Sequence, residues 1–200
     1  GKTGLSEDYW MTDITISHRS WSYIQGHTYK TPDLVIRNMI DVWSKRGVVL
    51  LNISPTADGE IPASQRSVLL GIGAWIDQHE EAIYGTRAHH IHGYGDAAFE
   101  KGHFGGQSAT IDYSQSDIRF TKAKDGNSLY VFSLGMPAPN AKLAIKEIKG
   151  PENSLNVAGV SVLGSGTPVS WSFENELLTI NTPEAALMDS ISTVFKVELN

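Results

Sequence analysis

The chain of 200 residues contains no cysteine, which excludes disulfides, thiolate metal sites and cysteine nucleophiles. It also lacks an apolar run of about 18 residues, so the sequence predicts no membrane-spanning helix. No basic stripe is present, and 16 Lys+Arg against 22 Asp+Glu give a net charge of -6. This charge argues against nucleic acid as a partner.

The composition that is present is that of an ordinary globular protein. Apolar residues make up 40% of the chain and charged residues 19%, which is enough apolar mass for a core in one domain or two small ones. Intrinsic disorder is not expected from these values. The chain opens with Gly1-Lys2-Thr3-Gly4 and no initiator Met, so we expect a processed chain or a piece of a longer protein.

Residues 31–47 show the apolar periodicity of a helix. Thr31 is placed to cap its start. Lys45 and Arg46 fall in the expected last turn, where cations favour the helix dipole, and Gly47 is placed to end the helix.

An unbroken apolar run over residues 48–53 follows this helix directly. A run without alternation is typical of a strand buried on both faces in a parallel sheet. A loop rich in Pro, Asp and Gly covers 54–62, and a second helix is expected over 63–79. Helix, buried strand, loop and helix make one slice of an α/β fold.

The pattern of apolar residues changes near Thr86. We interpret this point as the boundary between two domains, 1–85 and 86–200. Beyond it, short alternating segments replace helical periodicity, and 124–127 and 174–176 have the composition of tight turns. Short strands at this spacing predict an antiparallel β-sandwich. The expected strands cover residues 118–121, 129–134, 142–148, 156–163, 169–173, 177–180 and 193–199.

Residues 88–108 are rich in glycine and histidine and are expected to form a long loop. Within it, His89, His90 and His92 raise the hypothesis of a metal site, because imidazoles two apart on a strand share a face. The cluster has no further ligand at an established spacing. We therefore expect exposed loop histidines and no metal.

Trp171 and Phe173 alternate on one expected strand and so share a face. Two aromatic side chains side by side are suited to stack on a sugar in a binding module. Packing between two sheets uses the same pattern, and it is the interpretation that we favour.

Three stretches of the first half carry specific motifs. Residues 10–23 open with Trp-Met-Thr-Asp and end with Ser-Trp-Ser-Tyr. Residues 41–62 contain Asp-Val-Trp-Ser-Lys-Arg-Gly, Leu-Leu-Asn-Ile-Ser-Pro and Asp-Gly-Glu-Ile-Pro, and residues 70–86 contain Leu-Gly-Ile-Gly-Ala-Trp and Glu-Ala-Ile-Tyr-Gly-Thr. In order and spacing, the three together resemble glycoside hydrolase family 29, the retaining α-L-fucosidases. The tail resembles the family's β-sandwich in character and position only.

The resemblance implies a fold class of α/β plus all-β. Residues 1–85 would be the terminal slice of a (β/α)8-like barrel, and residues 86–200 the antiparallel β-sandwich that follows it. Such a barrel needs roughly 250 residues, so the chain resembles the C-terminal part of the enzyme. The expected partner is the missing N-terminal barrel segment, or a second copy bound through open strand edges. Without such a partner, the apolar surface of the strands stays in water at a cost of about 25 cal/mol per Å2. This cost would offset the whole free energy of unfolding of a domain, which is ~5–15 kcal/mol.

A retaining glycosidase needs two carboxyl groups about 5–5.5 Å apart, one nucleophile and one acid/base. The resemblance places both before the first residue, so no catalytic residue is expected in this chain. Met11 stands where many relatives carry Glu. Glu7 and Asp8 lie near the expected acid/base loop and are interpreted as solvated residues. A third hypothesis is a minimal fucosidase that recruits Glu7, Asp13 or Glu60 as replacement carboxylates.

Trp21 is the residue whose family role carries over, as the aromatic side chain that packs on the apolar face of fucose. Ser22 replaces the glycine that usually follows it. The alternative for Trp21 is a core position that closes the barrel end. The polar residues at and after the end of the strand 48–53 have two interpretations. They are either sugar-facing or loop-positioning groups, or they are structural, with Asp58 and Gly59 forming a turn and Asn52 satisfying backbone groups near the strand end; we favour the structural interpretation. These residues are Asn52, Ser54, Asp58 and Glu60.

The resemblance implies hydrolysis of terminal α-L-fucosyl residues on a fucosylated oligosaccharide or glycoconjugate, with retention and without a cofactor. On this interpretation the chain alone is inactive or nearly so. By analogy, a periplasmic or secreted setting suits glycan degradation. The alternative is a non-catalytic carbohydrate-binding or structural module, with 86–200 as its working part.

Overall fold

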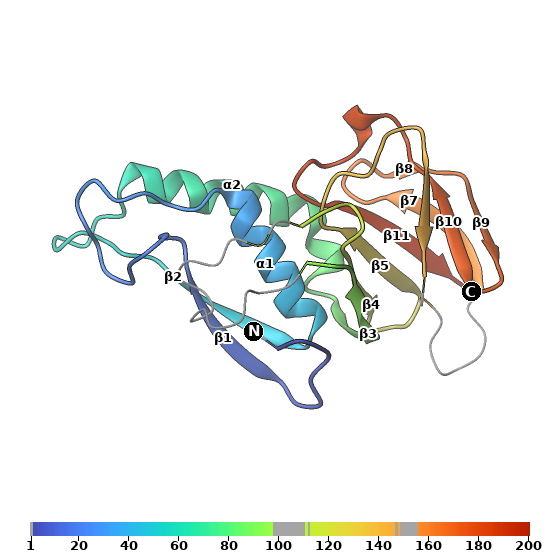
Figure 1. The fold of residues 1–200 in the computed structure, drawn as a ribbon, viewed down its shortest axis with the longest axis horizontal. Coiled ribbons are helices and arrows are strands. Elements are labelled where there is room, and N and C mark those ends of the chain that lie inside the picture. Colours follow the sequence, from blue (N-terminus) through green and yellow to red (C-terminus); the bar gives the residue numbers. More distant parts are fainter. Residues whose placement is uncertain (1, 98–110, 112, 147, 149–155) are drawn as a thin grey trace.

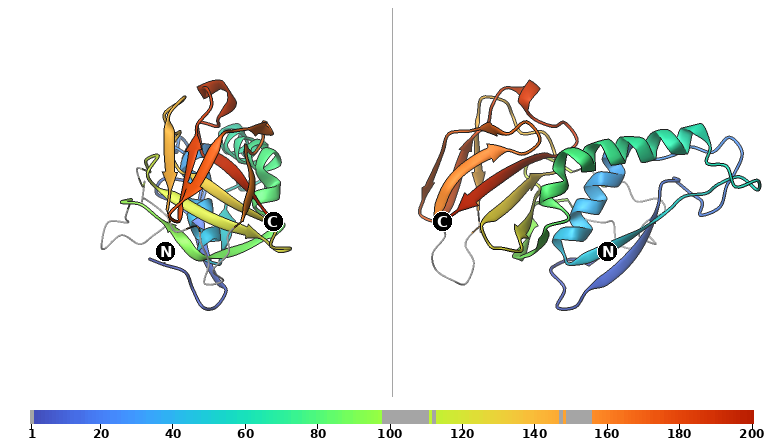
Figure 2. Two further views of the ribbon diagram at one scale, coloured as in Figure 1. Left: turned by 90° about the vertical axis from the view of Figure 1, so that its right-hand side faces the viewer. Right: turned by 180° about the vertical axis from the view of Figure 1, so that it is seen from behind.

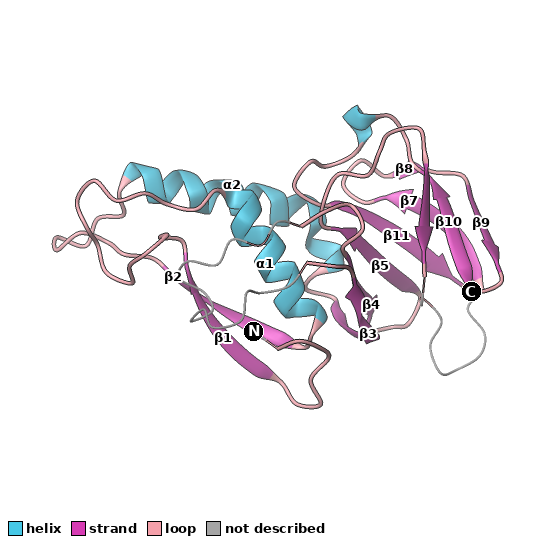
Figure 3. Ribbon diagram, viewed as in Figure 1, coloured by secondary structure: helices cyan, strands magenta, loops and turns pink. Residues whose placement is uncertain are grey.

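A computed structural model describes residues 2–97, 111, 113–146, 148 and 156–200. Two helices lie between a small parallel sheet and a larger β-sandwich (Figures 1 and 3). The helices therefore have strands on both sides, as the view from behind also shows (Figure 2). Neither helix of the described residues combines the length and the hydropathy that a membrane-spanning helix needs.

The first part of the chain alternates strands and helices. β1 and β2 pair in parallel, from Trp10 opposite Gly47 to Thr15 opposite Asn52, and α1 makes the crossover between them. The elements are β1 (Trp10–Thr15), α1 (Pro32–Ser44), β2 (Gly47–Asn52), α2 (Ala63–His79) and the 3-10 turn η1 (Glu80–Ala82). Both predicted helices are confirmed, whereas β1 was not predicted.

The end of α1 differs from the prediction. The helix stops at Ser44, and Arg46 rather than Gly47 takes the left-handed backbone conformation, with φ of 68°. Gly47 instead begins β2, where an added Cβ would lie 2.5 Å from Val42 and 2.8 Å from Trp10. Its role is close packing, not helix termination. Thr31 occupies the N-cap position, but its side chain makes no capping hydrogen bond.

Residues 48–53 form the predicted strand, but only one of its faces is buried in this chain. Val48 is 53% exposed and Leu50 is 56% exposed, while Val49 and Leu51 pack on the helices. On β1, Met11 is 66% exposed on the same open face, opposite Val48. The reason is that β1 and β2 form a two-stranded sheet with helices on one side only.

The second part is an antiparallel sandwich, as predicted. A six-stranded sheet of order β3-β4-β5-β11-β7-β8 packs on a three-stranded sheet of order β6-β10-β9. The strands are β3 (Thr86–Tyr94), β4 (Ile118–Ala123), β5 (Ser128–Ser133), β6 (Lys142–Ile145), β7 (Val157–Val162), β8 (Thr167–Pro168), β9 (Trp171–Glu174), β10 (Leu177–Asn181) and β11 (Thr193–Leu199), with the 3-10 turn η2 (Ala185–Leu187) before β11.

Both predicted tight turns occur. Gly126, with φ of 86°, turns the chain between β4 and β5. Between β9 and β10, Asn175 and Glu176 both have positive φ, of 50° and 66°, which is the geometry of a two-residue hairpin turn.

The six-stranded sheet is covered on both faces, and every residue of β5 is buried. Tyr130 and Phe132 join the core formed with α1 and α2, whereas Leu129 and Val131 face the second sheet. One hydrophobic core therefore crosses the expected boundary near Thr86. That boundary remains a prediction, and it falls between η1 and β3.

Polar contacts tie the same two parts together. The Thr121 hydroxyl donates to the carbonyl oxygen of Ala82 at 2.8 Å. Glu81 accepts a hydrogen bond from the Tyr130 hydroxyl at 2.7 Å and pairs with Lys196 at 2.6 Å. The helices and the six-stranded sheet are thus held by hydrogen bonds as well as by apolar packing.

Trp171 and Phe173 are half-buried and pack against the core between the two sheets. The Trp171–Phe173 face is therefore occupied by protein side chains. This arrangement agrees with the packing interpretation that we favour from the sequence.

Residues 88–94 belong to strand β3, so the prediction of a loop there is wrong; residues 98–110 lie outside the described part. His89 is buried against the Phe120 ring, and its Nε2 lies 3.2 Å from the carbonyl oxygen of Ile148. Burial and the neighbouring His90 lower the pKa of His89 to about 4. Among the described residues, no three His, Asp or Glu side chains are grouped to hold a metal ion.

Candidate functional site

The carboxyl ends of β1 and β2 lie side by side and form the candidate site. Because Thr15 and Asn52 are paired in the parallel register, the segments that follow both strands leave from one edge. The segment after β1 returns on itself, with Ser17 bridged to Tyr29 and the Lys30 amide donating to the Ile16 carbonyl at 2.8 Å. We call residues 18–28, which this pairing closes, the tryptophan loop.

Buried polar groups hold the base of the tryptophan loop. The Lys30 ammonium donates to the Thr15 carbonyl at 3.0 Å, and burial lowers the pKa of this amine. The Asn52 side-chain nitrogen Nδ2 donates to the Thr15 hydroxyl and to the Trp21 carbonyl, both at 3.1 Å. The loop is therefore anchored to the ends of both strands.

Serine hydroxyls fix the backbone on either side of Trp21. The Ser20 amide donates to the Ser17 hydroxyl at 3.2 Å, and the Ser20 carbonyl accepts from the Thr15 hydroxyl at 3.3 Å. The Ser20 hydroxyl also bridges to the amide and carbonyl of Ser22, at 3.1 and 2.8 Å. Trp21 itself is half-buried, so part of its side chain remains accessible.

Gln65 of α2 holds the backbone directly after β2. Its side chain bonds both backbone groups of Ser54, accepting from the amide at 3.0 Å and donating to the carbonyl at 2.6 Å. The same amide nitrogen donates to the Tyr29 hydroxyl at 3.1 Å. Gln65 was not identified from the sequence. Its position could have indicated a buried hydrogen-bonding role, because it lies three residues before Val68 on the buried face of α2.

The carboxylates named from the sequence are all exposed, and only some lie near this edge. Asp13 is on the open face of β1, opposite Leu50. Asp58 and Glu60 lie in a turn where the Glu60 carbonyl accepts from the Thr56 amide at 2.9 Å. The remaining two, Glu7 and Asp8, precede β1.

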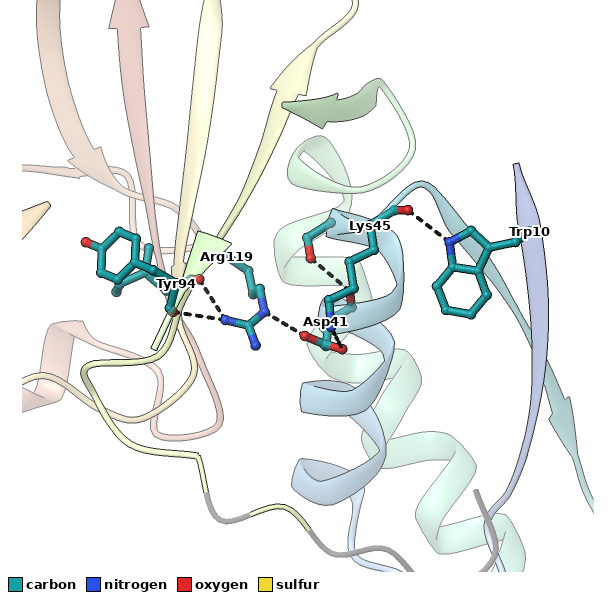
Figure 4. Close-up of polar contacts among 7 residues, drawn as sticks. Trp10, Asp41, Lys45, Tyr94 and Arg119 are labelled. Atoms are coloured by element: carbon teal, nitrogen blue, oxygen red, sulfur yellow. Dashed lines mark hydrogen bonds and ion pairs between the residues drawn. The ribbon is translucent and has the colours of Figure 1, made fainter. Parts of the chain in front are cut away.

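A second polar cluster joins α1 to the six-stranded sheet (Figure 4). The Asp41 carboxylate is 3% exposed and pairs with Lys45 at 2.6 Å and with Arg119 at 2.7 Å. Arg119 also donates to the carbonyls of Tyr94 and Ile118, at 3.1 and 2.9 Å. We call Asp41, Lys45 and Arg119 the ionic triad.

The ionic triad contacts β1 and contributes to the pKa shift of His92. The Lys45 carbonyl accepts from the indole nitrogen of Trp10 at 2.9 Å (Figure 4). Burial lowers the pKa of Lys45, and Asp41 opposes that shift. Burial and the charges of Lys45 and Arg119 lower the pKa of His92 to about 4, so His92 is neutral at pH 7.

A groove of about 690 Å3 opens beside β2. Its walls come from β2, the last turns of α1 and α2, the chain after η1, and β3 and β4. We call it the junction groove. Its apolar lining includes Met39, Trp43, Val48, Val49, Ile76 and Ile83.

Two family models each match a part of the chain. Residues 1–81 match the family model described as Alpha-L-fucosidase, and residues 111–198 match the one described as Alpha-L-fucosidase C-terminal domain. The plasma alpha-L-fucosidase of Rattus norvegicus is 27% identical over 165 residues, which are 81% of this chain and 31% of that protein. The tissue alpha-L-fucosidase of Mus musculus is 31% identical over 86 residues, which are 42% of this chain and 19% of that protein.

Solved structures agree with the family comparison. An alpha-L-fucosidase structure matches with a TM-score of 0.75 at 27% identity, covering 99% of this chain and 40% of that chain. The Thermotoga maritima alpha-fucosidase in complex with fucose matches with a TM-score of 0.72 at 29% identity, covering 96% of this chain and 40% of that chain. The chain thus spans about a third of the length of the plasma alpha-L-fucosidases that it matches, from 31% to 34%.

Proposed function

The chain is alpha-L-fucosidase-like in both of its matched parts, and we propose that it is the carboxyl-terminal part of a retaining alpha-L-fucosidase of glycoside hydrolase family 29. The whole enzyme hydrolyses terminal α-L-fucosyl residues of oligosaccharides or glycoconjugates and takes no cofactor. The observation that carries the proposal is the tryptophan loop, anchored at the edge where β1 and β2 end.

In this proposal the chain binds and orients the sugar, and the rest of the polypeptide supplies the chemistry. Trp21 presents an indole face on which the apolar face of fucose stacks. The nucleophile and the acid/base, about 5–5.5 Å apart, belong to the remaining polypeptide. Asp13 and Glu60 are both exposed, which is consistent with this division.

We also propose that β1, α1, β2 and α2 are the last units of a (β/α)8-like barrel. Such a part of a barrel has a parallel strand pair with helices on one face only. Here the other face of the pair exposes Met11, Val48 and Leu50. The occupant of this open face and of the junction groove is then the rest of the fucosidase polypeptide. The share of the relatives that this chain covers supports that choice.

The open face predicts the behaviour of the chain in solution. Two exposed apolar strands with unpaired edges should drive self-association as concentration rises, and should bind a hydrophobic dye. Sedimentation velocity is expected to show concentration-dependent growth for the wild type and a monomer for the Val48→Lys, Leu50→Lys variant. A wild-type chain that stays a 21.8 kDa monomer and binds no dye would contradict the proposed occupant.

Binding of L-fucose to the chain tests the function itself. We expect weak binding, which Trp21→Ala reduces about tenfold, because an aromatic contact contributes roughly 0.5–1.5 kcal/mol beyond its buried area. Trp21→Phe keeps an aromatic face and should retain most of the affinity. The measurement is a ligand-observed NMR titration, and equal affinity of the Trp21→Ala and wild-type chains would count against the proposal.

A further inference from the structure

The side chain of Asn52 connects the end of β2 to the backbone of Trp21, which is 31 residues earlier in the chain. Its single amide nitrogen carries two hydrogens, and both have an acceptor. One goes to the Trp21 carbonyl and the other to the Thr15 hydroxyl, each at 3.1 Å.

We propose that Asn52 is a positioning residue, which fixes the orientation of Trp21 toward the bound sugar. The inference rests on the proposed function, since it assumes that the Trp21 ring is the surface on which the sugar stacks. Stacking depends on the tilt of the ring, and in an enzyme a misplacement of about 1 Å in a positioning group can cost about 100-fold in rate. Asn52 bonds the carbonyl oxygen of Trp21 itself, and that carbonyl group is attached to the Cα that carries the ring.

The hydrogen bonds around Asn52 allow only one assignment of donors and acceptors. The Thr15 hydroxyl has one hydrogen, which it donates to the Ser20 carbonyl at 3.3 Å. It can therefore only accept from Asn52 and from the Ser17 amide, which lies at 3.2 Å. Position 52 must supply a donor to two acceptors, and a carboxylate of the same shape cannot do so.

Asn52 also stands on a rigid support, which a positioning residue requires. Its own carbonyl accepts from the Ile16 amide at 3.2 Å, directly after the end of β1. Two residues on, Ser54 is held by Gln65 of α2. The tryptophan loop is therefore fixed against an element that is itself fixed to the core.

The chain contains five tryptophans, so 19F NMR of the chain labelled with 5-fluorotryptophan can follow Trp21 by itself. Trp21→Phe identifies its resonance. We expect Asn52→Asp to shift and broaden this resonance while the other four stay in place, and to reduce L-fucose affinity about tenfold. Asn52→Ser, whose hydroxyl is too short to reach Trp21, should give the same change and serves if Asn52→Asp does not fold.

The matched control is Asn181→Asp. The Asn181 amide nitrogen likewise donates to two acceptors, the carbonyl and hydroxyl of Ser170 at 3.3 and 3.0 Å, but it lies on β10. This variant should leave the Trp21 resonance and L-fucose affinity unchanged.

Two outcomes separate the positioning role from the proposed function. An unchanged Trp21 resonance in Asn52→Asp and Asn52→Ser overturns the positioning role. The second outcome is a shifted Trp21 resonance in the Asn52 variants together with an L-fucose affinity that Trp21→Ala leaves unchanged. It supports the positioning role of Asn52 and overturns the proposed function.

Discussion

Asp41→Asn is expected to lower the free energy of unfolding by about 3–5 kcal/mol. The substitution keeps the shape of the side chain but removes the only anion of the ionic triad. Lys45 can respond by losing its proton, because burial already lowers its pKa. Arg119 cannot, since a guanidinium stays charged at any accessible pH, so a buried cation remains without its partner.

The measurement is chemical denaturation at pH 7, with Asp77→Asn as the control. Asp77 is also a helical aspartate, but it is exposed, and its substitution should change stability by less than about 0.5 kcal/mol. Replacing the whole triad, as Asp41→Leu with Lys45→Met and Arg119→Met, should recover most of the lost stability, because no unpaired charge is left. A loss under about 1 kcal/mol for Asp41→Asn would contradict the charge argument.

Residues 86–200 expressed alone are expected not to fold cooperatively. In the whole chain, Tyr130, Phe132 and Val194 project from the six-stranded sheet into the core built with α1 and α2. Without residues 1–85 this face of the sheet meets water, and each large side chain loses roughly 1.5–3 kcal/mol of burial. The fragment also loses the hydrogen bond between Tyr130 and Glu81 and the ion pair between Lys196 and Glu81.

Urea denaturation followed by near-ultraviolet circular dichroism compares the fragment with the whole chain. The whole chain should unfold in one transition, and the fragment should show no transition. A fragment that unfolds at the same urea midpoint as the whole chain would contradict the shared core. It would also favour the alternative of an independent carbohydrate-binding or structural module.

The sequence predicts the elements better than it predicts which of their faces are covered. Both helices and most strands were found because their periodicity is local, whereas β1 was missed because Trp10–Thr15 mixes polar and apolar residues on both faces. An unbroken apolar run indicates a doubly buried strand, and the run at 48–53 was interpreted so. In this chain β2 is covered on one side and β5 on both, because the layers that cover a strand come from distant parts of the chain.

The same distinction explains the candidate site. Trp21 was identified by resemblance, as part of a recognisable motif, but its support was not. Asn52 lies 31 residues from Trp21, and Arg119 lies 78 residues from Asp41. Hydrogen bonds and ion pairs over such separations leave no periodic signal, so only the folded structure reveals them.

The doubly covered six-stranded sheet limits how this sandwich could be exchanged between proteins during evolution. A domain that folds alone can be joined to a new neighbour by any flexible linker. This sandwich needs an apolar surface shaped like that of α1 and α2, together with groups that match Arg119 and Tyr130. A recombination point near residue 86 would therefore separate strands from the helices that complete them, and the sandwich and the helices are expected to be inherited as one piece.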